Sequence, residues 1–319
     1  MLKIFRGLID SGFVSRTKLN TVRVKVHTSC QWTCFFCHME GNKRSQSVKD
    51  VSGLIEILLE FRNKLHFSEV HLTGGEPSIH PRIVEIISKI VDAGFVVKMT
   101  TNGQAKTIRY KECVDAGLSE LNISVHTLNP MHLGKMMYPS KDMVWGSKAI
   151  QSQIRLVKDL TGLIKIKINT CVDANEEGAL AVSELAMEYG LKWRAMNVLE
   201  NPEASYKALG RMCEKLRAVP VEAVIIEGSS SCSVQMHCAN GFDFKVKLIR
   251  QNYLQHMCND CPVDKSALCY EFFYGPRLEM YDGKFLVRSC IHRNGMPFVL
   301  SVNEFFKSSL YKDIRNVIS

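Results

Sequence analysis

Residues 21–37 read TVRVKVHTSCQWTCFFC, in which an apolar-rich run leads directly into three closely spaced cysteines. The run over 21–29 predicts a β-strand, and Cys30, Cys34 and Cys37 then lie on the loop that follows it. Three thiols this close together suit the binding of one iron-sulfur cluster. Three thiolates on a four-iron cube leave one iron without a protein ligand, and an open metal position is typical of a reactive centre.

Two other interpretations of the three cysteines stay open at this point. They could form a zinc site that takes a fourth ligand from His27 or His38, or they could be ordinary half-buried thiols. The spacing C-x3-C-x2-C is unusual for zinc, which favours an iron-sulfur cluster.

Downstream of the cysteines, helix-like and strand-like segments alternate. The expected helices cover residues 48–65, 81–93, 150–160 and 179–189, and the further expected strands cover residues 68–77, 95–103, 121–127, 163–172 and 191–198. Six strands separated by helices predict βα units, and hence an α/β fold with a parallel sheet covered by helices. Periodicity alone does not separate a barrel from an open doubly wound sheet.

Polar and glycine-containing motifs follow the strands. They are GGEP at residues 74–77, TTNG at residues 100–103 and SVHT at residues 124–127, in addition to the cysteine loop. Active sites of parallel α/β folds are built at the carboxyl ends of the strands. The sequence therefore predicts one site at that end of the sheet.

These motifs, in this order, resemble the radical S-adenosylmethionine (radical SAM) superfamily, in which an aromatic residue, here Phe36, precedes the last cysteine. The resemblance implies a partial (β/α)6 TIM barrel and a 4Fe-4S cluster on Cys30, Cys34 and Cys37, the catalytic ligands. It implies that the cluster reductively cleaves SAM to a 5′-deoxyadenosyl radical that takes hydrogen from an unactivated carbon. The residues expected to bind this cofactor are Phe36, Gly74, Gly75, Glu76, Pro77, Thr101, Asn102, Ser124, Asn169 and Arg194, with Glu76 on the SAM ammonium.

Composition limits the other function classes. The 319 residues are 46% hydrophobic and 23% charged, which fits a globular protein with a sizeable core. A net charge of +9 without a Lys/Arg block does not indicate a polymeric nucleic acid partner. No long apolar run or secretory signal is found, so we expect a cytoplasmic protein without a membrane partner, whose 12 cysteines serve as metal ligands or buried thiols.

A second cysteine group lies in the C-terminal part. We expect residues 1–202 to form the core and residues 203–319 a smaller subdomain with a strand at 221–227, a serine-rich turn at 229–233 and a hairpin at Asn240 and Gly241. Cys258, Cys261, Cys269 and Cys290 could bind zinc or an iron-sulfur cluster.

Residues 258–261 and 275–290 resemble the GTP cyclase branch of molybdenum-cofactor biosynthesis, which carries an auxiliary 4Fe-4S cluster in this twitch-like region. Arg16, Arg23 and Arg194 resemble arginines of the same branch. Cys269 departs from it, since a fourth thiolate would close the cluster. The printed chain also ends in Asn-Val-Ile-Ser rather than Gly-Gly. Both departures favour a relative that acts on a different nucleotide or nucleoside.

Cationic side chains are the candidate substrate ligands. Lys165 and Lys167 share one face of their strand and, with Lys98, could bind phosphates, although solvated lysines at strand edges are an equally good interpretation. The full set of expected substrate contacts is Arg16, Arg23, Lys98, Lys165, Lys167 and Arg277. His126 could handle a proton, but a core or surface histidine is the more common case.

Three functions compete. The first is a radical SAM enzyme, lyase- or cyclase-like, that forms or rearranges a carbon bond in a nucleotide or nucleoside and is supplied by a flavodoxin- or ferredoxin-type reductant. The second is a peptide-modifying radical SAM enzyme, for which the 29 residues before Cys30 are too few to form a recognition domain. The third is a non-catalytic iron-sulfur electron carrier, in which the SAM-binding motifs would have no purpose.

Overall fold

The computed structural model describes residues 2–259, 261, 269, 271–293, 295 and 298–318. Its strands form one 13-stranded sheet in the order β1-β8-β9-β10-β7-β6-β5-β4-β3-β2-β11-β12-β13. No helix among the described residues has the length and apolar character needed to cross a membrane.

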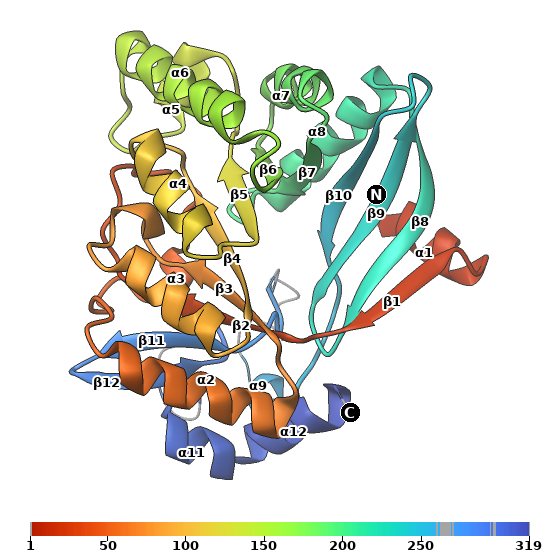
Figure 1. The fold of residues 1–319 in the computed structure, drawn as a ribbon. Helices are drawn as coiled ribbons and strands as arrows, with labels where there is room; N and C mark the ends of the chain where they lie inside the picture. The colour runs from red at the N-terminus through yellow and green to blue at the C-terminus, as the bar shows by residue number, and fades with distance from the viewer. Residues whose placement is uncertain are drawn as a thin grey trace.

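The central strands run parallel, as the sequence predicted. They are β2 (Thr21–Lys25), β3 (Glu69–Thr73), β4 (Val96–Thr101), β5 (Glu120–Ser124), β6 (Lys165–Val172) and β7 (Lys192–Asn197). Figure 1 shows these strands in a curved sheet that forms part of a barrel, with helices along the outside. The prediction of a partial TIM barrel is therefore confirmed.

The connecting helices are α2 (Val51–Leu65), α3 (Ile83–Asp92), α4 (Thr107–Asp115), α5 (Pro130–Lys135), α6 (Met143–Leu160), α7 (Glu177–Glu188) and α8 (Pro202–Lys215). Side-chain caps fix several of their starts, such as Asp50, which accepts a hydrogen bond from the Gly53 amide, and Asp142, which accepts one from the Trp145 amide. Sequence patterns did not predict α4 and α5. Both are short, and α4 has a weakly apolar sequence that gives little periodic signal.

The C-terminal residues extend the sheet at both of its sides. An antiparallel unit of β8 (Ala218–Glu227), β9 (Ser231–Cys238) and β10 (Asp243–Ile249) joins β7, with the predicted hairpin at Asn240 and Gly241 between β9 and β10. The serine-rich segment is only partly a turn, because β9 already begins at Ser231. On the other side, β11 (Arg277–Tyr281) pairs with β2, followed by β12 (Lys284–Arg288) and β13 (Val299–Ser301).

The two ends of the chain pack onto this frame. At the N-terminus, α1 (Leu2–Asp10) precedes β1 (Val14–Lys18), which pairs in parallel with β8. At the C-terminus, α11 (Val302–Lys307) and α12 (Ser309–Ile318) lie beneath α2 (Figure 1), where Phe305 stacks on Phe61 with 5.7 Å between ring centroids. The described helices also include α9 (Gln255–Cys258) and two short 3-10 segments, η1 (Met39–Gly41) and η2 (Pro77–Ile79).

Candidate active site

The cysteine loop follows β2 and is held against the segment after α5. Cys34 forms a β-bridge with Met137, the Phe35 amide donates to the Met136 carbonyl at 3.0 Å, and the Tyr138 amide donates to the Thr33 carbonyl at 2.8 Å. The side chains of Trp32, Met136 and Met137 are buried beneath this contact. The loop that carries the three cysteines is therefore fixed by backbone pairing and by a small apolar cluster.

Gly74 and Gly75 allow a close backbone approach to the same loop. The Gly75 amide donates to the His27 carbonyl at 2.8 Å, and the Glu76 amide donates to the Ser29 carbonyl at 2.8 Å. A Cβ atom on Gly75 would lie 2.0 Å from the Ser29 carbonyl oxygen, and one on Gly74 would lie 2.4 Å from the His27 oxygen. Only glycine fits at these two positions.

Glu76 connects the carboxyl end of β3 to that of β4. Its buried carboxylate accepts hydrogen bonds from the Ser78 hydroxyl at 2.6 Å, the Thr101 hydroxyl at 2.6 Å and the Asn102 amide at 2.6 Å. Burial raises the pKa of Glu76, while these hydrogen bonds lower it. Glu76 thus has a structural task, organising residues 101–102, in addition to its predicted contact with SAM.

Two polar groups lie close to the sulfur of Cys30. The Trp32 amide lies 3.4 Å from the Cys30 sulfur, and the Asn102 side-chain amide lies 3.7 Å from it. Hydrogen bonds to sulfur stabilise thiolates that bind iron. Burial raises the pKa of the free Cys30 thiol to about 11 and also raises the pKa values of Cys34 and Cys37. The positive charge of a bound metal centre is therefore what would make these groups thiolates.

These residues line one cavity, which we call the cluster cavity. Of the predicted residues it contains Arg23, Cys30, Cys34, Phe36, Cys37, Gly74, Gly75, Glu76, Thr101, Asn102, Ser124 and His126. Pro77 lies outside the lining, in η2. Asn169 and Arg194 are also outside it and hydrogen bond to each other at 3.0 Å, deeper in the barrel. The sequence missed Cys171 on β6, whose side chain lines the cluster cavity.

The second cysteine group also surrounds a small cavity, lined by Cys258, Cys261, Cys269 and Cys290 together with Met257, Phe272, His292 and Arg293. The Phe272 amide lies 3.3 Å from the Cys269 sulfur and the His292 amide 3.4 Å from the Cys290 sulfur. Four thiols with amide donors fit an iron-sulfur cluster. Residues 262–268, in the segment that adds Cys269, lie outside the described residues.

Within the described part of the chain, no group of three or more His, Cys, Asp and Glu side chains is arranged to hold a metal ion.

A buried ionic network joins the cysteine loop to the C-terminal strands. Glu40 in η1 accepts from Arg23 on β2 at 2.5 Å and from Arg277 on β11 at 2.6 Å. Arg277 also forms an ion pair with Glu271. The two arginines hold the pKa of the Glu40 carboxyl well below its usual range despite burial. Arg23 and Arg277, predicted to bind substrate, are therefore already paired with carboxylates.

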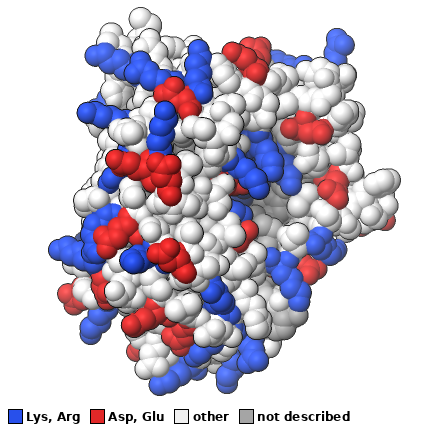
Figure 2. Space-filling model, in the orientation of Figure 1, with Lys and Arg blue, Asp and Glu red and all other residues white. Residues whose placement is uncertain are grey.

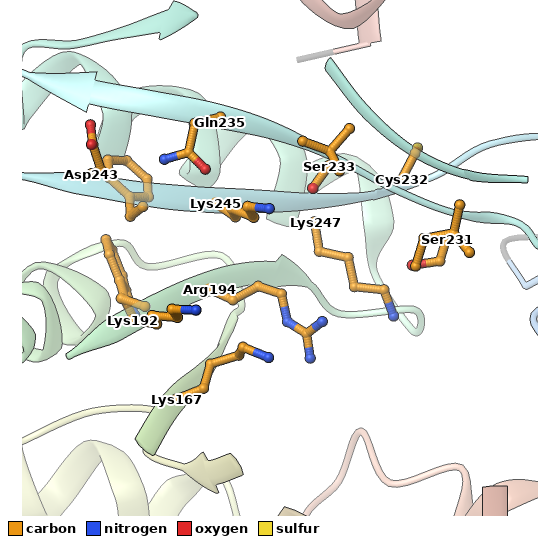
Figure 3. A pocket seen from close by; sticks show the side chains of 14 residues that line it. Lys167, Lys192, Arg194, Ser231, Cys232, Ser233, Gln235, Asp243, Lys245 and Lys247 are labelled. Carbon is orange, nitrogen blue, oxygen red and sulfur yellow. The ribbon is translucent and has the colours of Figure 1, made fainter. Parts of the chain in front are cut away.

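A second, basic cavity lies deeper in the barrel, lined by Lys167, Lys192, Arg194, Lys245 and Lys247 with Asp243 as the one acidic residue of its lining. In Figure 3 the side chains of Lys167, Arg194 and Lys247 extend into the same open space. Figure 2 shows Lys and Arg side chains at the rim of a hollow in this region. Lys247 also lines the cluster cavity, so the two cavities share a wall residue.

The remaining predicted cations occupy different positions. Lys98 pairs with Glu69 and Lys167 with Glu120, each at 2.7 Å between nitrogen and oxygen. Lys165 is exposed at the start of β6, and the exposed Arg16 lies 3.6 Å from Glu227. Lys245 and Lys247 were missed, although their alternation in the sequence KVKLI is the signal that places both on one face of β10.

Comparisons with known proteins agree with this geometry. Residues 24–173 match the family model described as "Radical SAM superfamily". A protein named "Probable GTP 3′,8-cyclase" from Sulfolobus acidocaldarius is 36% identical over 36% of this chain and 36% of its own length. One of the same name from Thermoplasma volcanium is 30% identical over 53% of this chain and 50% of its own length. The chain thus spans between about a third and a half of these curated relatives.

Solved structures share the fold. Streptococcus suis SuiB bound to S-adenosylmethionine matches 98% of this chain and 71% of its own with a TM-score of 0.60 and 14% identity. The enzyme anSMEcpe with bound AdoMet matches 92% of this chain and 82% of its own with a TM-score of 0.52 and 11% identity. At these identities the likeness concerns the fold alone.

Proposed function

We propose that this chain, whose residues 24–173 belong to the radical SAM superfamily, is a radical SAM enzyme that acts on a phosphorylated nucleotide-like substrate to form or rearrange a carbon bond. The observation that carries the proposal is the cluster cavity, in which the three cysteines of one loop meet Glu76, Asn102 and Ser124 from three further strand ends. Such an arrangement would have no use in a simple electron carrier.

The chain's own residues would bind and orient the reactants. Cys30, Cys34 and Cys37 would hold a 4Fe-4S cluster, and Phe36, Gly75, Glu76, Asn102 and Ser124 would line the space for SAM. When bound, the cluster and SAM together would supply a 5′-deoxyadenosyl radical. The buried walls of the cavity, including Trp32 and His126, would exclude water from it.

The basic cavity supports a phosphorylated substrate. Lys192, Arg194, Lys245 and Lys247 bring four cations to a partly enclosed space beside the cluster cavity. Guanidinium and ammonium groups in such a space suit phosphate oxygens. The name of the curated relatives, which refers to GTP, is consistent with a nucleotide. A substrate seated here would extend past Lys247 toward the cluster cavity.

The C-terminal region would hold a second cluster. We propose that Cys258, Cys261, Cys269 and Cys290 bind an auxiliary 4Fe-4S cluster and that residues 1–202 and 203–319 form the core and the auxiliary part. Four cysteine ligands would close this cluster, which suits electron transfer or structure rather than substrate binding. A flavodoxin- or ferredoxin-type protein would supply the electrons.

The test is anaerobic reconstitution of wild type and a Cys30/Cys34/Cys37 triple alanine variant, followed by incubation with SAM and dithionite. We expect about eight irons in wild type and about four in the variant, with 5′-deoxyadenosine formed by wild type alone. A matched control replaces three buried cysteines outside both groups, Cys113, Cys213 and Cys238, and keeps all the iron. Failure of wild type to form 5′-deoxyadenosine would overturn the proposed activity.

A further inference from the structure

Tyr274 lies among cations at the base of the barrel. The Lys247 ammonium is 4.3 Å from the centroid of its ring, and the guanidinium carbons of Arg23 and Arg277 are 5.4 and 5.7 Å away. The ring lines a cavity that also reaches Lys167 and Arg194, both of which line the basic cavity as well. The neighbouring Ser229 hydroxyl donates to the Tyr274 carbonyl at 2.6 Å. This hydrogen bond fixes the backbone and does not involve the phenol.

The glutamates near these cations already form ion pairs. Glu40 pairs with Arg23 and Arg277, Glu271 with Arg277, Glu69 with Lys98 and Glu120 with Lys167. Among the described residues, Lys247 and Arg194 have no carboxylate in an ion pair. His71 also lies near Arg23 and Arg194. Its burial, and then these cations, hold its pKa well below the usual range, so it adds no charge. The phenol of Tyr274 is then the group placed to become the counter-ion of Lys247.

We propose that Tyr274 is an acid–base residue of the substrate cavity, a phenolate opposite Lys247 in the free enzyme that accepts a proton from a bound substrate O–H or N–H group. The step moves one proton: the phenolate oxygen becomes a phenol, the substrate oxygen or nitrogen becomes its conjugate base, and the proton returns before product leaves. No electron is transferred in this step. The inference rests on the proposed function, because it assumes an anionic substrate in the basic cavity.

Electrostatics support this assignment. The charges of Lys247, then Arg23 and Arg194, lower the pKa of Tyr274 to about 7 in spite of burial, whereas a free tyrosine titrates near pH 10. A substrate phosphate beside Lys247 and Arg194 would offset these charges and raise the pKa of Tyr274 again. Substrate binding would thereby convert a weak base into a stronger one. Between the two pKa values, the phenolate takes up one proton on binding. A substrate with an O–H or N–H group at Tyr274 supplies this proton itself, whereas an anion without such a group draws it from solvent, so the affinity for that anion falls as pH rises above about 7.

The first test is an optical titration that needs no substrate. The absorbance of tyrosinate is recorded against pH for the reconstituted wild type and Tyr274→Phe, with Tyr281→Phe, which removes an exposed tyrosine on β11, as the matched control. We expect wild type, but not Tyr274→Phe, to show one tyrosine that ionises near pH 7. Lys247→Met should move this ionisation toward pH 10. Equal titration curves for wild type and Tyr274→Phe would overturn the proposal.

The second test counts protons on binding. Tripolyphosphate is titrated into each protein by calorimetry in two buffers of different ionisation enthalpy, between pH 7 and 10, where the proposal expects proton uptake. Because tripolyphosphate itself holds a titratable proton in this range, the readout is the difference between the proteins. Wild type and Tyr281→Phe should take up close to one proton more than Tyr274→Phe, which should bind as well as wild type below pH 7. The same uptake in Tyr274→Phe would contradict the proposal.

The two proposals fail separately. We expect Tyr274→Phe to keep its iron, because Tyr274 is not part of the cluster cavity, and the titration of the phenol needs neither SAM nor a substrate. If wild type forms no 5′-deoxyadenosine, the enzymatic activity is wrong whatever the titration shows. If Tyr274→Phe loses its iron, the Lys247→Met titration still decides the role of the phenol.

Discussion

At the scale of single residues, the site depends on short contacts between strand ends. The sequence motifs predicted that the three cysteines, Glu76 and Asn102 lie close together, and the structure places them around one cavity. The motifs could not predict that both oxygens of Glu76 are already used by the protein, one by Ser78 and Thr101 and the other by Asn102. Such hydrogen bonds depend on how three loops meet, which no local pattern encodes.

Glu76→Gln should destabilise the fold as well as impair SAM binding. The amide nitrogen of glutamine would face donors of Ser78, Thr101 or Asn102, and a buried polar group left unsatisfied costs about 1–3 kcal/mol. Urea unfolding of the apoprotein measures this cost. The matched control is Glu85→Gln on α3, an exposed carboxylate paired with Arg82, which should leave stability nearly unchanged. Equal stabilities of the two variants would contradict the structural task given to Glu76.

Gly75→Ala should be more damaging than any exposed glycine substitution. The new Cβ would meet the Ser29 carbonyl oxygen at 2.0 Å, and neither backbone can move without breaking the hydrogen bonds between residues 27–29 and 75–76. We expect a loss of about 3 kcal/mol or more in the free energy of unfolding. Gly210→Ala in α8 is the control, because nothing lies within 4 Å of its Cβ position, and it should stabilise the protein by about 0.5–1 kcal/mol. A Gly75→Ala protein as stable as wild type would show that the approach is looser than described.

At the scale of elements, the alternation of strands and helices could be predicted because apolar residues recur along each buried parallel strand. Strand β3, EVHLT, and strand β6, KIKINTCV, were located in this way to within a few residues. The side of the barrel that holds the basic cavity was harder to predict, since it depends on which strand lies next to β7. That neighbour is β10, which lies C-terminal to the barrel strands in the sequence and pairs with β7. It brings Lys245 and Lys247 to the basic cavity.

Lys245→Met should weaken anion binding where Lys98→Met does not. Lys245 lies in the basic cavity, and no carboxylate among the described residues forms an ion pair with it. Burial lowers its pKa, so a bound anion would favour the charged form of the ammonium group and interact with it. Lys98 is neutralised by Glu69 at 2.7 Å. We expect the dissociation constant for tripolyphosphate, measured by calorimetry, to rise about tenfold in Lys245→Met, which is about 1.4 kcal/mol. It should change less than about twofold in Lys98→Met, and the reverse order would mean that the anion binds elsewhere.

At the scale of the whole molecule, residues far apart in the sequence complete one continuous sheet. Strand β11 pairs with β2 across more than 250 positions, with Arg277 opposite Arg23. The two like charges are compatible because Glu40 accepts from both arginines and Glu271 pairs with Arg277. This pairing could not be predicted from sequence patterns, because the alternation within β11 does not identify its partner strand. Glu40 therefore links the cysteine loop, the barrel and the C-terminal strands.

Glu40→Gln tests this link. Removing the carboxylate leaves Arg23 buried beside Arg277 with only Glu271 to balance them, and breaking a buried pair in this way costs about 3–5 kcal/mol. We expect thermal unfolding of the reconstituted protein to shift down accordingly, with lower iron content because the loop carrying Cys37 loses its anchor. Glu203→Gln, an exposed carboxylate paired with Lys207 on α8, is the control and should leave stability nearly unchanged. Adding Arg23→Met to Glu40→Gln should recover part of the loss, since it removes the unpaired buried charge. If the double variant is instead less stable by the full sum of the two single losses, Glu40 and Arg23 act independently and the proposed link between the two halves of the sheet does not exist.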